Sequence, residues 1–223
     1  MTGGRTANPF DMSHPSHPAG ARSDAPSALH ALVVAHFERS IAVAEAFFAA
    51  EAGRIAEACL AIARRFHRGG RLLAFGNGAA ATDAQHVAVE FVHPVIVGKR
   101  ALPALALTND SAAMSSLRGD DTGGAPFGRQ LAVLARETDI AVGFSGDGRC
   151  PNVLEALNIA RGKGLLTMAL AGGDGGLLVG AGLDYCFVVP DTDSLVVQET
   201  HETLYHVLWE LVHVYFEHEG LLR

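Results

Sequence analysis

The stretch Arg71–His93, RLLAFGNGAAATDAQHVAVEFVH, combines three features that decide the fold. A short apolar run, Leu72–Phe75, has the length and composition of a buried strand. The glycine turn Gly76-Asn77-Gly78 follows it, and a helical pattern carrying His86 and Glu90 comes next. This order of strand, glycine turn and helix places backbone N–H groups around an anion site at the start of the helix.

His86 and Glu90 are four residues apart and therefore share one face of the expected helix. A pair at this spacing is often only a surface ion pair, which stabilises a helix by roughly 0.2–0.5 kcal/mol. The position of the pair directly after a glycine turn favours a functional interpretation, either as metal ligands or as an acid/base pair.

Four further apolar runs of strand length follow, at residues 101–107, 140–144, 165–169 and 185–189. Helical patterns separate them, and Pro151 suits the first turn of a helix over residues 152–161. Continuous apolar strands that alternate with helices are typical of a parallel sheet covered on both faces. We therefore expect an α/β fold, a three-layer sandwich around a five-stranded, doubly wound parallel sheet.

Ligands of such sheets bind beyond the carboxyl ends of the strands. Four loops follow the expected strands at this edge, at residues 76–80, 108–111, 145–150 and 172–176. These loops are therefore the expected lining of a functional site.

Residues 1–27 are rich in Gly, Pro, Ser and His and contain almost no apolar side chains. Such a segment cannot bury enough surface to order itself, so we expect a disordered tail. A metal site at His14 and His17 is the less favoured interpretation.

Helical apolar spacing begins after Ser27, a suitable N-cap residue, and continues to about Arg68. Gly53 interrupts the pattern, so we expect two N-terminal helices within residues 28–70, ahead of a domain at residues 71–223. The wide apolar face of the first helix packs either against another subunit or against the sheet of its own domain, and the pattern does not choose between them.

A last helical pattern runs from about residue 194 to residue 219. Gln198 and His206 are eight residues apart in it, which places them about 80° apart around the helix and two turns apart along it. Both side chains are therefore able to lean toward one ligand.

Composition excludes several classes of protein. The net charge is −7 without a cluster of Lys or Arg, which argues against a nucleic-acid ligand. The three cysteines are widely spaced, which favours a reducing compartment over a disulfide framework. No apolar run approaches the ~20 residues of a membrane helix, and the N-terminus lacks a signal-peptide pattern. We expect a cytoplasmic protein that binds neither nucleic acid nor membranes.

Five segments together carry a family resemblance: GNGAAATDAQHVAVE at residues 76–90, ALTND at 106–110, PNVLEAL at 151–157, GGDGG at 172–176 and QETHETLYHVLWELV at 198–212. They resemble the sugar isomerase (SIS) family and, within it, the phosphoheptose isomerases. The likeness runs from about Leu72 to His213. It implies a flavodoxin-like sheet and a homotetramer in which the N-terminal helices bundle.

The resemblance also implies an activity. Phosphoheptose isomerases interconvert sedoheptulose 7-phosphate and a heptose 7-phosphate through an enediol. By resemblance, His86, Glu90, Gln198 and His206 form a zinc site, and Glu90 and His206 supply the catalytic base and acid. Zinc then orders or polarises the substrate oxygens. The substrate is a sugar phosphate or a related carbohydrate derivative.

The same resemblance implies a set of substrate-binding residues. They are Asn77, Gly78, Asp120, Ser145, Gly146, Asp147, Cys150 and Gln198. Asp120 matches the family aspartate that closes the site.

The phosphate end departs from the family pattern. The family has a serine at the position of Ala80, and its second loop reads Ser-Thr-Ser-Gly-Asn-Ser where this chain has SGDGRC at residues 145–150. The second loop therefore lacks three hydroxyl donors, and each hydrogen bond to a charged group contributes ~1.5–3 kcal/mol. Asp147 repels a phosphate unless Arg149 compensates.

Two hypotheses follow. The first is a zinc-dependent aldose–ketose isomerase of phosphoheptose type, which the four metal-site residues favour. The second is a non-catalytic SIS protein that binds a carbohydrate derivative or a protein partner, as the replication-initiator-associating relatives do. The altered phosphate loop motivates this alternative.

Overall fold

The structure is a computed structural model that describes residues 25–116 and 126–222. Asp120, expected to close the site, lies outside the described residues, as does nearly all of the N-terminal tail. In chain order the elements are α1 (Ala25–His67), β1 (Leu72–Gly76), α2 (Ala79–Val92), β2 (Ala104–Ala106), α3 (Ser111–Ser116), α4 (Pro126–Leu134), β3 (Ile140–Ser145), α5 (Pro151–Gly162), β4 (Leu166–Gly172), β5 (Tyr185–Val189), α6 (Ser194–Glu217) and the 3₁₀ helix η1 (Glu219–Leu222).

The five strands form one parallel sheet in the order β2-β1-β3-β4-β5. In the register, Leu72 of β1 lies opposite Ala104 on one side and Ile140 on the other. The expected five-stranded, doubly wound sheet is therefore confirmed.

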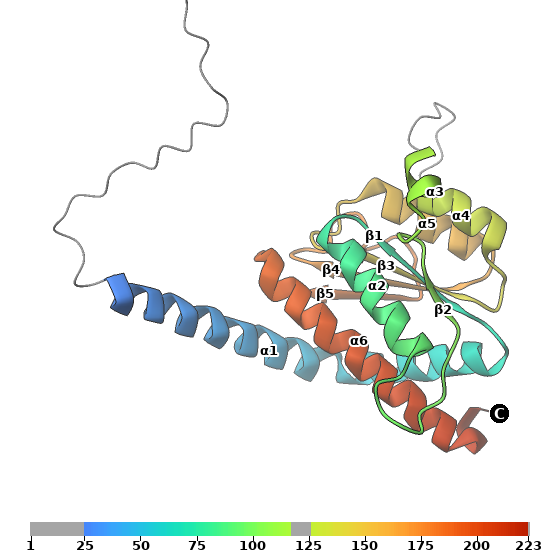
Figure 1. Ribbon diagram of the computed structural model, residues 1–223, viewed down its shortest axis with the longest axis horizontal. Helices are drawn as coiled ribbons and strands as arrows, with labels where there is room; N and C mark the ends of the chain where they lie inside the picture. The colour runs from blue at the N-terminus through green and yellow to red at the C-terminus, as the bar shows by residue number, and fades with distance from the viewer. Residues whose placement is uncertain (1–24, 117–125, 223) are drawn as a thin grey trace, which may run out of the picture. The chain divides into compact units, whose positions relative to one another are not determined.

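Alternate residues of each strand point to opposite faces and form two cores. Leu72 and Ala74 pack in a core with α1, α2 and α6, whereas Leu73 and Phe75 pack in a core with α4 and α5. Figure 1 shows α2 and α6 side by side over one face, with α4 and α5 on the other. The result is the expected three-layer sandwich.

A helical segment precedes the sheet, as expected, but it is the single continuous helix α1. Gly53 does not break it, and Ser27 lies inside the helix instead of capping it. A helical glycine costs only about 1 kcal/mol relative to alanine, and buried neighbours such as Phe47 and Ile55 outweigh that cost.

The chain divides into two units between Glu38 and Arg39, so the part of α1 from Arg39 onward belongs to the unit that holds the sheet. There its side chains pack in the core beside α2 and α6. This second part of α1 covers the sheet of its own domain, whereas most of the apolar face expected for the first helix, from Leu29 to Ile41, is exposed.

The order of the strands reverses between β1 and β3, because the chain passes from β1 outward to β2 and then returns to β3. In doubly wound sheets this switch point opens a crevice beyond the carboxyl ends of the two strands. The loops after β1 and β3 therefore define where a ligand binds. None of the helices within the described residues is long and apolar enough to cross a membrane.

Candidate metal centre and substrate pocket

A glycine turn sets the start of α2. Gly78 has a φ of 58°, in the region that favours glycine, and forms the N-cap of the helix. A Cβ on Gly76 would lie 2.6 Å from the carbonyl oxygen of Ala80. Both glycines are needed for the sharp reversal that brings α2 back over the sheet.

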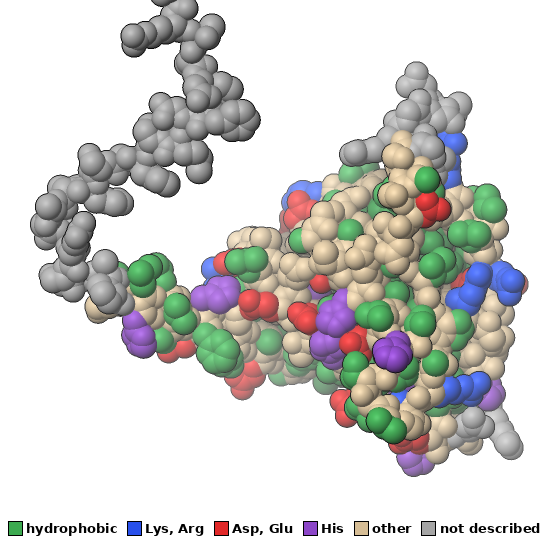
Figure 2. Space-filling model, in the orientation of Figure 1, with side chains coloured by type: hydrophobic (Ala, Val, Ile, Leu, Met, Phe, Trp, Pro, Cys, Tyr) green, Lys and Arg blue, Asp and Glu red, His purple; other side chains and the backbone are tan. Residues whose placement is uncertain are grey.

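His86, Glu90 and His206 form the candidate metal centre. Their ligand atoms all lie within 4.8 Å of one another. His86 Nε2 is 3.3 Å from Glu90 Oε1, and the rings of His86 and His206 meet edge to face with their centroids 5.2 Å apart. Figure 2 shows histidine and acidic side chains gathered on the face that carries α2 and α6.

The donor set fits zinc. Two imidazoles and one carboxylate are ligands that zinc prefers. His86 and Glu90 come from one turn of α2, whereas His206 comes from α6. The packing of α2 against α6 therefore assembles the group.

Tyr205 orients His86. The Tyr205 hydroxyl lies 2.8 Å from His86 Nδ1, and the Glu202 carboxylate lies 3.5 Å from the same nitrogen. Burial raises the pKa of Tyr205, so the hydroxyl stays neutral. For Nε2 of His86 to bind a metal, Nδ1 must carry the proton and donate it to the Tyr205 oxygen.

Gln198 contacts α2 at Asp83, one turn before His86. Its Nε2 donates to Asp83 Oδ1 at 3.0 Å, while no described residue donates to its Oε1. Asp83 is buried, and burial raises its pKa to about 6 although the Gln198 hydrogen bond opposes the shift. Asp83 thus holds the amide, and the oxygen of Gln198 stays available as a ligand.

A pocket of about 240 Å³ adjoins this contact at the switch point. Asn77, Asp83, Gly146, Gln198 and His201 are among its lining residues. Its lining combines residues that follow β1 and β3 with residues from the first turns of α6, as expected for a doubly wound sheet.

Two side chains of this pocket are held by the protein itself. The Asn77 side-chain amide pairs with that of Asn152 through two hydrogen bonds of 2.9 Å. His201 Nε2 lies 3.1 Å from the carbonyl oxygen of Ala171, and burial lowers the pKa of His201 to about 4. His201 is therefore neutral at pH 7, and its Nε2 donates to that oxygen.

The loop after β3 does not replace the missing hydroxyl donors. Ser145 is buried, and its hydroxyl has no hydrogen-bond partner among the described residues. Asp147 Oδ1 accepts from the backbone N–H of Arg149 at 2.9 Å. Cys150 is the N-cap of α5 but makes no side-chain capping bond. The carboxylate of Asp147 thus takes a backbone donor that a phosphate could use.

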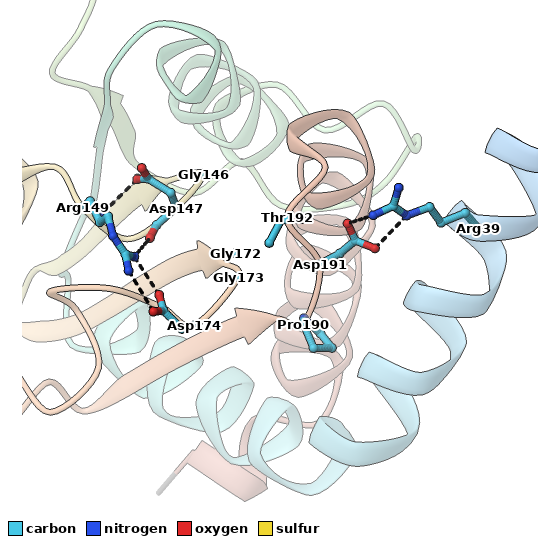
Figure 3. Close-up of a pocket in the computed structure, with 10 residues that line it drawn as sticks. All are labelled: Arg39, Gly146, Asp147, Arg149, Gly172, Gly173, Asp174, Pro190, Asp191 and Thr192. Carbon is cyan, nitrogen blue, oxygen red and sulfur yellow. Dashed lines mark hydrogen bonds and ion pairs between the residues drawn. The ribbon is translucent and has the colours of Figure 1, made fainter.

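A second pocket, of about 630 Å³, shares Gly146 with the first and is drawn in Figure 3. On one side, the Arg149 guanidinium binds Asp174 through two bonds of 2.7 and 2.8 Å. On the other, Arg39 binds Asp191 through bonds of 2.9 and 2.6 Å. Gly172 and Gly173 lie between these two pairs.

Several residues of the site were not among the sequence candidates. Asp83 precedes His86 by three residues and Glu90 by seven, a spacing that places all three on one helix face and that could have revealed it. Tyr205 follows Gln198 by seven residues, so the two lie on one face of the last helix, and this spacing could likewise have revealed Tyr205. Arg39 and Asp191 meet across 152 positions of the chain, and no local pattern indicates such a pair.

The chain matches known proteins over most of its length. The SIS domain family model matches residues 35–172. The phosphoheptose isomerase of Desulfovibrio desulfuricans is 41% identical over 193 residues, covering 86% of this chain and 91% of that protein. The enzyme of that name from Thermodesulfovibrio yellowstonii is 39% identical over 176 residues, covering 79% and 87%.

Solved structures agree. The phosphoheptose isomerase of Neisseria gonorrhoeae superposes with a TM-score of 0.76 at 32% identity, covering 82% of this chain and 98% of that one. The corresponding structure from Francisella tularensis gives a TM-score of 0.75 at 28% identity, with coverage of 82% and 96%.

Proposed function

The chain belongs to the SIS-domain family and, within it, to the phosphoheptose isomerases, and from this membership we propose its activity. The proposed activity is zinc-dependent aldose–ketose isomerisation of a sugar phosphate such as sedoheptulose 7-phosphate. The observation that carries the proposal is the convergence of His86, Glu90 and His206 from two helices, with ligand atoms within 4.8 Å of one another. Gln198 completes the proposed zinc site through its free Oε1.

The reaction moves a proton between two adjacent carbons through an enediol, which requires a base and an acid. Glu90 is the proposed base that takes the proton from carbon, and His206 is the proposed acid that protonates the substrate oxygen. Zinc, when bound, supplies Lewis-acid polarisation of a substrate oxygen. Tyr205 and Asp83 act on the substrate indirectly, because they hold His86 and Gln198 in place.

The substrate chain extends from the metal centre toward the switch point. Its proposed contacts are Asn77, Gly78, Asp120, Ser145, Gly146, Asp147, Cys150 and Gln198. Asn77, Gly146 and Gln198 line the smaller pocket, which supports their assignment.

Glu90→Gln tests the proposal. Removing the carboxylate removes both a zinc ligand and the base, so turnover of sedoheptulose 7-phosphate should fall by about 10²-fold or more. Turnover and zinc content are measured on the same purified protein. Glu210→Gln, which makes the same change at an exposed position of α6, is the control. Unchanged turnover in Glu90→Gln, or a wild-type protein without zinc affinity, would contradict the proposal.

A non-catalytic role is the second candidate, and one observation favours it. In the loop after β3, the chain's own Asp147 takes a backbone donor that a phosphate could use, and the Ser145 hydroxyl is buried. Zinc binding without turnover of any phosphosugar would support a protein that binds a carbohydrate derivative or a protein partner instead.

The proposal extends to assembly and location. Five apolar side chains at helical spacing on α1 are exposed: Leu29, Leu32, Val33, Phe37 and Ile41. A stripe of this kind supports a homotetramer in which the α1 helices of several copies bundle. The proposed location is the cytoplasm.

A further inference from the structure

Arg149 lies on the wall of the larger pocket with one edge of its guanidinium unused. The group has five N–H donors, arranged as an end edge (Nη1 and Nη2) and a side edge (Nε and Nη2). Asp174 takes the end edge, and the remaining N–H of Nη1 donates to the carbonyl oxygen of Asp147. The side edge has no acceptor among the described residues. It is a complete two-donor fork of the kind that binds carboxylate or phosphate.

The loops around Arg149 hold this arrangement in place. The N–H of Leu177 donates to the carbonyl oxygen of Gly148 at 2.8 Å, and a Cβ on Gly148 would lie 2.0 Å from the carbonyl oxygen of Gly175. The loop after β3 and the loop after β4 therefore touch backbone to backbone. Asp174 Oδ1 also accepts from the N–H of Gly176, which holds the carboxylate independently of Arg149.

Arg39, the other arginine of this pocket, differs in this respect. Its side edge is bound by both oxygens of Asp191, and its Nη1 lies 3.6 Å from the carboxylate of Asp193. Carboxylates therefore face both edges of Arg39. The free fork in the lining of this pocket belongs to Arg149.

Net charge does not attract an anion to this pocket. Its lining contains the two arginines and three aspartates, Asp147, Asp174 and Asp191. An anion that binds in this pocket therefore needs oriented hydrogen-bond donors, such as the side edge of Arg149, because the overall charge does not favour it.

We propose that Arg149 binds the phosphate of the sugar phosphate through its Nε–Nη2 edge and that Asp174 positions it. This inference rests on the proposed function, since it concerns the same substrate. Arg149 then takes the place of the hydroxyl donors that the loop lacks, and it is the specificity-determining residue at this end of the site.

The test is calorimetric binding of sedoheptulose 7-phosphate and of inorganic phosphate to the full-length protein. Arg149→Gln should weaken both by about tenfold or more, the effect of losing one charge-assisted contact. Arg149→Lys, which keeps the charge without the fork, should lie between Arg149→Gln and wild type. Binding of unphosphorylated sedoheptulose should not change. Arg161→Gln is the matched control, because Arg161 binds loop carbonyls outside this pocket.

Asp174→Asn tests the positioning role. The amide offers one acceptor oxygen in place of two, so Arg149 is held less firmly and phosphate affinity should fall, by less than in Arg149→Gln. Asp174→Glu, which keeps a carboxylate, should recover part of the affinity, and all three variants should keep the wild-type melting temperature because the pair is exposed. Wild-type or higher phosphate affinity in Asp174→Asn would show that Asp174 does not position Arg149, and an Arg149→Gln variant with wild-type phosphate affinity overturns the inference.

These measurements also separate the two proposals. Phosphate binding that depends on Arg149 in a protein without turnover leaves this inference standing and rejects the isomerase. Turnover with a KM that Arg149→Gln does not alter leaves the isomerase standing and rejects this inference.

Discussion

At the scale of single residues, the hydroxyl of Tyr205 decides which nitrogen of His86 is left for a ligand. The hydroxyl engages Nδ1, and Nε2 faces Glu90. Tyr205 is only 2% exposed, so the packing around its ring fixes the position of the hydroxyl. Partners of this kind fix the tautomer and the ring orientation of a metal-binding histidine.

Tyr205→Phe should therefore weaken zinc binding. Loss of a hydrogen bond to a metal-binding histidine typically costs about 10- to 100-fold in metal affinity. Chelator competition measures the affinity, and circular dichroism confirms that the fold is retained. Tyr215→Phe, on the same helix but outside the candidate site, is the control; equal affinities in the two variants would refute a role for Tyr205.

The predictability of the site differed between its residues. His86, Glu90 and His206 were assigned by resemblance, and the structure brings these three together. Their supporting residues, Asp83 and Tyr205, could not be paired from the sequence, because each contact joins α2 to α6 across more than 100 positions. Such contacts depend on how two helices pack, which helical periodicity alone does not determine.

At the scale of elements, Arg71 and Asp139 join the beginnings of β1 and β3. Asp139 is fully buried and accepts from the N–H, Nε and Nη2 of Arg71 and from the N–H of Arg136. Burial by itself raises the pKa of Asp139, but these hydrogen bonds outweigh it and hold the pKa below its ordinary value. The ionised carboxylate therefore stabilises the central strand pair.

Asp139→Asn should lower the free energy of unfolding at pH 7 by about 3 kcal/mol. Breaking a buried ion pair costs about 3–5 kcal/mol, and we expect the lower value because Arg71 is partly exposed. The folded-state pKa is depressed, so the carboxylate's contribution is full above the unfolded value of about 3.9 and is lost as the pH falls through the folded value. Urea unfolding at pH 7 and at acid pH measures both effects.

The control is Glu45→Gln, the same change of charge at an exposed position on α1. Suppose that the free energies of unfolding of Asp139→Asn and wild type differ by the same amount at every pH down to 2. The ionised form of Asp139 is then not what stabilises the strand pair.

The elements themselves were largely predictable. Continuous apolar runs marked all five strands, since both faces of the sheet are covered. The expected break at Gly53 failed for a physical reason, because the local cost of one glycine is small beside the burial of the helix around it. Tertiary packing, which local propensity does not include, decided the continuity of α1.

At the scale of the whole molecule, one copy of the chain leaves the apolar stripe on α1 exposed. Leu29, Leu32, Val33 and Phe37 are each between 63% and 70% exposed. Burial of one large apolar side chain contributes about 1.5–3 kcal/mol, so several such residues are enough to drive association of helices.

Replacing both Leu32 and Phe37 with Gln should therefore shift the proposed homotetramer toward smaller species at micromolar concentration. Light scattering coupled to size-exclusion chromatography measures the mass. Val97→Gln, which removes a fully exposed apolar side chain away from α1, should leave the mass unchanged. A wild-type protein that is monomeric would contradict the proposed assembly.

The candidate metal centre and the loop with Arg149 belong to different elements. His86, Glu90 and His206 project from α2 and α6, whereas the loop connects β3 to α5, and Gly146 of that loop lines both pockets. Mutations in that loop can therefore accumulate without disturbing the reaction centre. A gene copy in this family can acquire a new preference for the tail of its substrate while it inherits the chemistry unchanged, which gives evolution a route to new sugars by small steps.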